Sequence, residues 1–105
     1  MRIWDVPCSE LADAQLLGEH RELHCLWAVM GTSRGYSRHR ETLRWVGYRW
    51  RLWHRHEEQA EEMGRRGWKH ASPLDCPPVD SLVRPPSITP IDEQRQMLAE
   101  RGGLR

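Results

Sequence analysis

Amines that could act as nucleophiles are scarce in this chain of 105 residues, which holds fifteen arginines and one lysine, Lys69. Arginine stays protonated, with a pKa above about 12, so it cannot attack an electrophilic carbon. The α-amine of Met1 is the second candidate. Its pKa is ordinarily about 7.7–8.0, against about 10.4 for a lysine, so more of it is neutral near pH 7. For chemistry that forms an imine, the sequence therefore favours Met1 over Lys69.

A run of carboxylates follows this end of the chain. Residues 9–23 read S-E-L-A-D-x-x-L-x-x-E-x-R-E-L. Ser9 is a favourable N-cap and acids in the first turns suit the helix dipole, so we expect a helix over residues 9–30. Glu19 and Glu22 are three residues apart and would share a similar face. Two neighbouring carboxylates tend to raise the pKa of one of them.

The motif at residues 9–23 resembles the catalytic helix of the pyrimidine dimer DNA glycosylases of the phage endonuclease V type. The resemblance is close over residues 1–30 and weaker but collinear over 49–70, where Arg-Arg-Gly-Trp resembles the phage Lys-Arg-Gly-Phe. The Met-Arg-Ile-Trp-Asp opening and residues 35–39 are similar to a shorter bacterial branch. The aromatic C-terminal tail of the phage enzyme has no counterpart here. The resemblance implies a compact all-α fold.

The same resemblance assigns roles to residues. Met1 aligns with the amine nucleophile and should be retained, because Arg2 is too bulky for removal of the methionine. Glu22 aligns with the Glu that stabilises the cation at sugar C1′ and handles protons on the opened sugar. Arg21 aligns with an Arg that grips DNA beside the lesion, and Arg2 adds a phosphate contact. The implied activity is a glycosylase with AP-lyase activity on cyclobutane pyrimidine dimers, through a Schiff base and β-elimination.

Apolar spacing and breaker residues predict three helices, over residues 9–30, 41–66 and 90–101. Between the last two, residues 71–90 hold six of the seven prolines and are expected to form an extended connection. We therefore expect an all-α single domain over residues 1–105, with Pro-rich and Gly-rich loops between its helices.

The first eight residues are expected to be extended, since Pro7 prevents an early helix. Ile3, Trp4 and Val6 would pack across the first helix, and Gly18 would allow a close approach. Base-flipping proteins use aromatic wedges, and six tryptophans are present. We expect three of these in the core (Trp27, Trp50 and Trp53) and two exposed (Trp45 and Trp68).

Positive charge is concentrated although the net charge is only +1. Between Arg34 and Arg55 lie seven arginines against one acid, Glu41. Such a block is a plausible phosphate-binding surface, whereas the alternative is a solvated face paired with the acids at 57–62. The candidate phosphate contacts are Arg34, Arg38, Arg44 and Arg51, with Arg65 and Arg66 further along.

Metal and disulfide chemistry have weaker signals. His20 and His24 are four residues apart and Cys25 follows, which could begin a zinc site, but no distant ligand pair is evident. We therefore expect no metal and no cofactor. The remaining histidines could touch phosphates. Three cysteines without CxxC spacing argue against a disulfide framework.

Nothing in the sequence resembles a membrane span or a signal peptide, so we expect a cytoplasmic protein, nucleoid-associated when bound to DNA. The expected partner is damaged double-stranded DNA, bound by a monomer. Two alternatives stay open. One is an AP lyase or a glycosylase for another lesion, and the other is a non-catalytic helical module that binds nucleic acid through the basic block.

Overall fold

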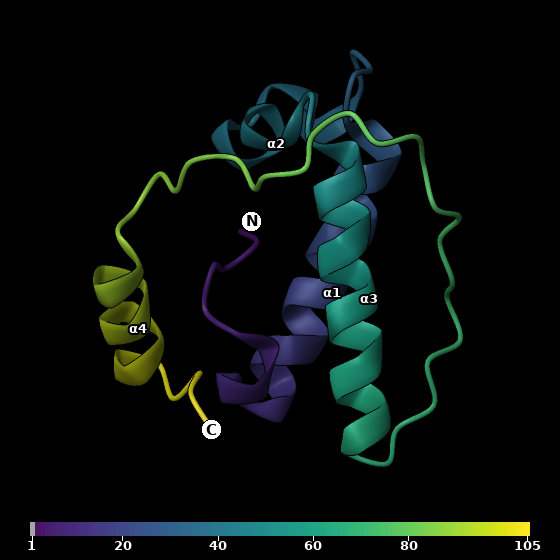
Figure 1. The fold of residues 1–105 in the computed structure, drawn as a ribbon. Coiled ribbons are helices and arrows are strands. Elements are labelled where there is room, and N and C mark those ends of the chain that lie inside the picture. Colours follow the sequence, from purple (N-terminus) through teal and green to yellow (C-terminus); the bar gives the residue numbers. More distant parts are fainter. Residues whose placement is uncertain (1) are drawn as a thin grey trace.

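A computed structural model describes residues 2–105, which form four α-helices and no strand within that range. α1 and α3 pack side by side, and α4 lies across the N-terminal segment from them (Figure 1). None of the described helices is long and apolar enough to cross a membrane. The expected all-α single domain is confirmed. Its elements are η1 (Cys8–Glu10), α1 (Asp13–Val29), η2 (Gly35–Arg38), α2 (Arg40–Trp45), α3 (Arg49–Arg65) and α4 (Ile91–Glu100).

The N-terminal segment, residues 2–7, runs without regular secondary structure through the middle of the molecule (Figure 1). Ile3 and Val6 are completely buried and Trp4 is almost so, which confirms that this segment packs into the core. The expectation for Gly18 is wrong, because no atom lies within 4 Å of a Cβ built there.

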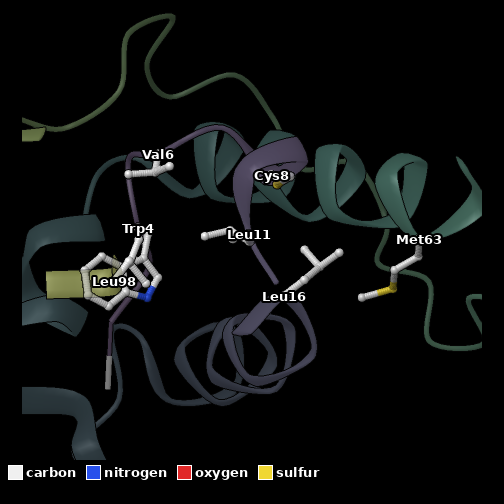
Figure 2. Close-up of a cluster of buried hydrophobic side chains, with 7 residues drawn as sticks. All are labelled: Trp4, Val6, Cys8, Leu11, Leu16, Met63 and Leu98. Carbon is white, nitrogen blue, oxygen red and sulfur yellow. The ribbon is translucent and has the colours of Figure 1, made fainter. Parts of the chain in front are cut away.

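Two hydrophobic clusters meet at this segment. Ile3 belongs to one of them, and Trp4 and Val6 belong to the other. Each cluster draws on α1 and α3, so the segment is fixed by both. The first contains Trp4, Val6, Cys8, Leu11, Leu16, Met63 and Leu98 (Figure 2). The second contains Ile3, Leu23, Leu26, Met30, Trp45 and Leu52.

α1 begins at Asp13 rather than at residue 9, and Ser9 does not cap it. The cause is pairing with the C-terminal residues. The N–H of Ala12 donates to the carbonyl of Gly103 at 2.9 Å, and the N–H of Arg105 donates to the carbonyl of Glu10 at 2.7 Å. Tertiary hydrogen bonds thus hold Leu11 and Ala12 extended, between η1 and α1, against the local helix signal.

The helix expected over 41–66 is two helices, because the chain turns at Gly47, whose φ is +85°. Glycine is the residue that adopts this left-handed conformation without strain. The turn leaves Leu43 and Val46 exposed. It also buries Trp45 completely, against expectation, and the indole N–H donates to Glu41 at 3.2 Å. Trp68, also expected to be exposed, is half-buried against the first cluster.

The connection after α3 is extended up to residue 90, as the prolines indicated, and passes α3 and α2 before it reaches α4 (Figure 1). The carboxylate of Asp80 accepts from the N–H groups of Arg49 and Trp50 at 2.9 and 3.1 Å, and so caps the start of α3. The indole N–H of Trp53 donates to the carbonyl of Leu74 at 2.9 Å. The third expected helix is confirmed at Ile91–Glu100.

Candidate active site

A cavity of about 440 Å³ lies beside the N-terminal segment and α1. It brings together two residues that the sequence singled out, Arg2 and Glu22. A second cavity of about 200 Å³ shares Arg2 and His39 with the first. Met1, the proposed nucleophile, lies outside the described residues. The site is therefore built from Arg2 onward.

Two carboxylates line the larger cavity, and they differ in their surroundings. Glu19 is 1% exposed and accepts from the Trp4 N–H at 2.8 Å, from the Arg55 guanidinium at 2.8 and 3.0 Å, and from Gln59. Glu22 is half-buried and enters none of the hydrogen bonds or ion pairs among residues 2–105. Because the lone pairs of Glu19 are occupied, Glu22 is the carboxylate available for chemistry in this cavity.

The pair Glu19–Arg55 fastens the N-terminal segment to α1 and α3. Burial by itself lowers the pKa of Arg55, but the charge and hydrogen bonds of Glu19 outweigh this and raise it. The same guanidinium donates to the carbonyl of Val6 at 2.9 Å. Arg55 belongs to the basic block in sequence, yet it is 1% exposed and serves the core.

A second polar network fastens the other side of the segment. Arg44 contacts Asp5 at 2.6 Å and Glu41 at 2.8 Å, and Glu41 accepts the Ile3 N–H at 3.3 Å. Gln94 of α4 accepts the Asp5 N–H at 2.8 Å and donates to its carboxylate at 2.8 Å. Burial alone would raise the pKa of Asp5, but its hydrogen bonds, that from Gln94 foremost, lower it. Residues 3–6 are thus held through their backbone from several directions.

The arginines expected to contact DNA fall into two groups. Arg21, Arg34 and Arg38 are exposed, and Arg2 and Arg51 are half-buried.

Two other arginines of the expected DNA-binding set have nearly buried side chains that are paired with carboxylates of the protein. Arg44 is 5% exposed, and Arg66 is 3% exposed and contacts Glu62 and Asp13, each at 2.9 Å. Arg65 is exposed but paired with Glu61 and Glu62. The basic block is therefore not one continuous surface, and Arg44 and Arg66 stabilise the fold.

Sequence reasoning missed one cation that lines the larger cavity, Arg101, whereas His39, which also lines it, is one of the histidines expected to touch phosphates. The guanidinium groups of Arg2 and Arg101 lie 4.9 and 5.6 Å from the ring centroid of Trp4. No local signal connects Arg101 with Trp4, because the two are separated by nearly the whole chain. The cavity thus combines Glu22, a carboxylate with no partner among residues 2–105, with a cationic rim formed by Arg2 and Arg101.

The comparison with known families decides the class of this protein. A family model described as pyrimidine dimer DNA glycosylase matches residues 1–75. This chain belongs to that family. The match confirms the resemblance found in the motif and assigns a DNA repair glycosylase that acts on DNA. It covers α1, α2 and α3 and ends before α4. No curated protein and no solved structure matched the chain.

The structural role of Glu19 in this glycosylase can be measured. Glu19→Ala removes the hydrogen-bonded carboxylate of buried Arg55 and leaves it only the more distant Glu58 carboxylate at 3.7 Å, so we expect the free energy of unfolding to fall by about 3–5 kcal/mol. The control Glu61→Ala removes an exposed contact to Arg65 of 2.6 Å and should change it by less than about 0.5 kcal/mol. Urea unfolding of both variants checks this. Equal losses in the two variants would contradict the anchoring role of Glu19.

Proposed function

We propose that this glycosylase also acts as an AP lyase, and that its substrate is the cyclobutane pyrimidine dimer in duplex DNA. Family membership supports the glycosylase class. The observation that carries the finer proposal is the cavity that is lined both by Arg2, the covalent neighbour of Met1, and by Glu22, the available carboxylate. The protein would act as a monomer, and the imine chemistry itself uses neither a cofactor nor a metal.

The proposed reaction begins at the α-amine of Met1. The amine nitrogen bonds to sugar C1′, the glycosidic bond breaks, and the base leaves with its electron pair and takes up a proton. Ring opening gives a protonated imine between the protein and the sugar. Loss of a proton from C2′ then expels the 3′ phosphate by β-elimination and nicks the strand. Water hydrolyses the imine and frees the amine.

Glu22 would stabilise the positive charge that develops at C1′ and then carry protons on the opened sugar. A carboxylate that no side chain or backbone group of residues 2–105 occupies can do both, since its lone pairs can face the substrate. Glu19 cannot take this role without giving up its contacts to Trp4 and Arg55. Glu19 would thus have the structural role and Glu22 the chemical one.

Anchoring of the N-terminal segment supports the choice of the α-amine. Chain termini are usually poorly ordered, and poor order would lower the rate at which a terminal amine attacks its substrate. Here the N–H groups of Ile3, Trp4 and Asp5 all donate to side chains of α1, α2 or α4. Such positioning before substrate binds lowers the entropic cost of attack. Lys69 is exposed and is absent from the cavity wall.

DNA would approach the cationic rim of the cavity. Arg2, His39 and Arg101 line the cavity, and Arg38 precedes His39 on the exposed turn η2. A volume of about 440 Å³ lies in the range of small-ligand sites and suits an extruded nucleotide. We propose that the exposed arginines at 21, 34 and 38 hold the flanking phosphates.

The nucleophile can be identified by borohydride trapping on dimer-containing and abasic duplexes. Adding one residue before Met1 displaces the amine, so trapped adduct should fall about 100-fold. Lys69→Ala is the control and should trap as well as the native protein. Mass spectrometry of the native protein must show a free amine at Met1.

Loss of trapping in Lys69→Ala but not in the extended protein would transfer the nucleophile to Lys69. Adduct on abasic DNA alone would point to the alternative AP lyase. No adduct on either duplex would favour the non-catalytic binding module.

The role of Glu22 is tested by Glu22→Gln, which keeps the shape of the side chain and removes its charge. We expect the rate constant for strand cleavage to fall about 10²–10⁴-fold while the Kd for DNA stays unchanged. Single-turnover nicking and binding assays separate the two quantities. Glu61→Gln, which alters an exposed acid outside the cavity, is the matched control. A native cleavage rate in Glu22→Gln would remove Glu22 from the mechanism.

The DNA-binding surface predicts a salt dependence. Arg34→Ala combined with Arg38→Ala should flatten the slope of log affinity against log salt by about one to two. Damaged and undamaged duplexes should weaken alike, whereas Arg21→Ala should penalise damaged DNA more. Arg95→Ala is the control, because Arg95 is paired with Glu10 at 3.0 Å. If the double variant keeps the native slope, DNA must bind along α1 alone.

A further inference from the structure

Four histidines from three segments converge beside α1 and α3. His20 and His24 lie one turn apart on α1, His56 lies on α3, and His70 lies on the connection that follows it. One ring nitrogen from each lies within 4.8 Å of the other three. The Nε2 atom of His20 is 3.2 Å from Nε2 of His24 and 3.2 Å from Nε2 of His70. Tetrahedral zinc with Zn–N bonds of about 2.0–2.1 Å places its ligand nitrogens about 3.3–3.4 Å apart.

A buried amide orients the first of these rings. The Nδ1 atom of His20 lies 2.8 Å from Oε1 of Gln59, and the amide nitrogen of Gln59 donates to Glu19. Because the Gln59 oxygen can only accept, His20 Nδ1 carries the proton and Nε2 presents its lone pair to the cluster. In metal sites, the ring nitrogen of a histidine ligand that does not bind the metal usually donates to an acceptor such as this amide oxygen.

His56 has neighbours at both ring nitrogens. Its Nδ1 atom lies 3.0 Å from a carboxylate oxygen of Glu57, and its Nε2 atom lies 3.1 Å from the carbonyl of Ser72. The Ser72 hydroxyl reaches the same centre, at 3.3 Å from His20 and 3.4 Å from His70. A metal ion would take the place of one of the His56 contacts, and the Glu57 carboxylate would offset part of its charge.

Burial of three of the four rings suits metal binding, since only neutral imidazole has a lone pair for a metal. Burial lowers the pKa of His20 to about 4. Burial also lowers the pKa values of His24 and His70, and the neighbouring imidazoles act in the same direction. These shifts all favour the neutral form of the ring. Imidazole ligands suit zinc, copper, nickel and iron rather than magnesium or calcium.

We propose that one divalent transition-metal ion, zinc foremost, is bound by four imidazoles, those of His20, His24, His56 and His70. Four protein ligands fill a tetrahedral shell, which is the arrangement of structural zinc. The ion would tie the connection after α3 to α1 and α3. None of the four histidines lines the catalytic cavity, so this site is separate from the proposed chemistry.

This proposal replaces the expectation of no metal. Sequence spacing alone indicates only His20, His24 and Cys25 as ligands and offers no distant pair to complete a site. The structure supplies that pair as His56 and His70. Cys25 is exposed and is not part of the group.

The test uses the full chain without a histidine tag. Metal content is measured by mass spectrometry of the purified protein, which is then stripped with a chelator and titrated with Zn²⁺ alone by calorimetry. We expect one equivalent per chain. Zinc in about 100-fold excess over its Kd should raise the Tm of the stripped protein by about 10–20 °C. A stripped protein that takes up no zinc, with an unchanged Tm, would overturn the proposal.

Variants separate the site from adventitious binding. His24→Ala and His70→Ala alter half-buried side chains and should weaken zinc binding at least about 100-fold. His54→Ala, two residues before His56 on α3, and Cys25→Ser are matched controls that should bind zinc as the native protein does. Co²⁺ should give the visible absorption of a tetrahedral site in the native protein and lose it in His24→Ala. If His54→Ala weakens zinc binding as much as His24→Ala, zinc is held elsewhere.

Discussion

Burial of an extended segment is the constraint on which this structure depends. Residues 3–6 cross the core without a neighbouring strand, so their backbone N–H and C=O groups need partners among side chains. Glu19 and Arg55 supply partners on one side, and Glu41, Arg44 and Gln94 do so on the other. Removing one member leaves either an orphaned backbone group or an unpaired buried charge. Buried charged side chains are therefore required because an extended segment crosses the core.

The same constraint explains why composition misleads about DNA binding. Several arginines of the basic block neutralise carboxylates inside the protein, as Arg44 does with Asp5 and Arg55 does with Glu19. Local charge along the sequence thus overstates the cationic surface. The exposed cations that remain include Arg21 on α1, Arg34 directly before η2 and Arg38 at the end of η2.

The proposed metal site and the proposed catalytic site share one structural member. Gln59 accepts from His20 and donates to Glu19, and Glu19 accepts the Trp4 N–H beside the cavity. Fixing the His20 ring therefore fixes, through two hydrogen bonds, the carboxylate that anchors the N-terminal segment. A small domain of this size has a limited hydrophobic core, and a bound ion is one way such domains gain stability.

The sequence by itself determined the features that depend on neighbouring residues: the helix at 91–100, the proline-rich connection before it, and the family motif with Glu22. Prolines and motif spacing are local signals that survive folding, whereas the capping signal at Ser9 does not. Only the tertiary structure decided that α1 begins at Asp13, that the chain turns at Gly47, and that His70 joins a cluster on α1 and α3. These outcomes come from hydrogen bonds and packing between segments far apart in the chain, which outweigh local preference and leave no trace in residue spacing.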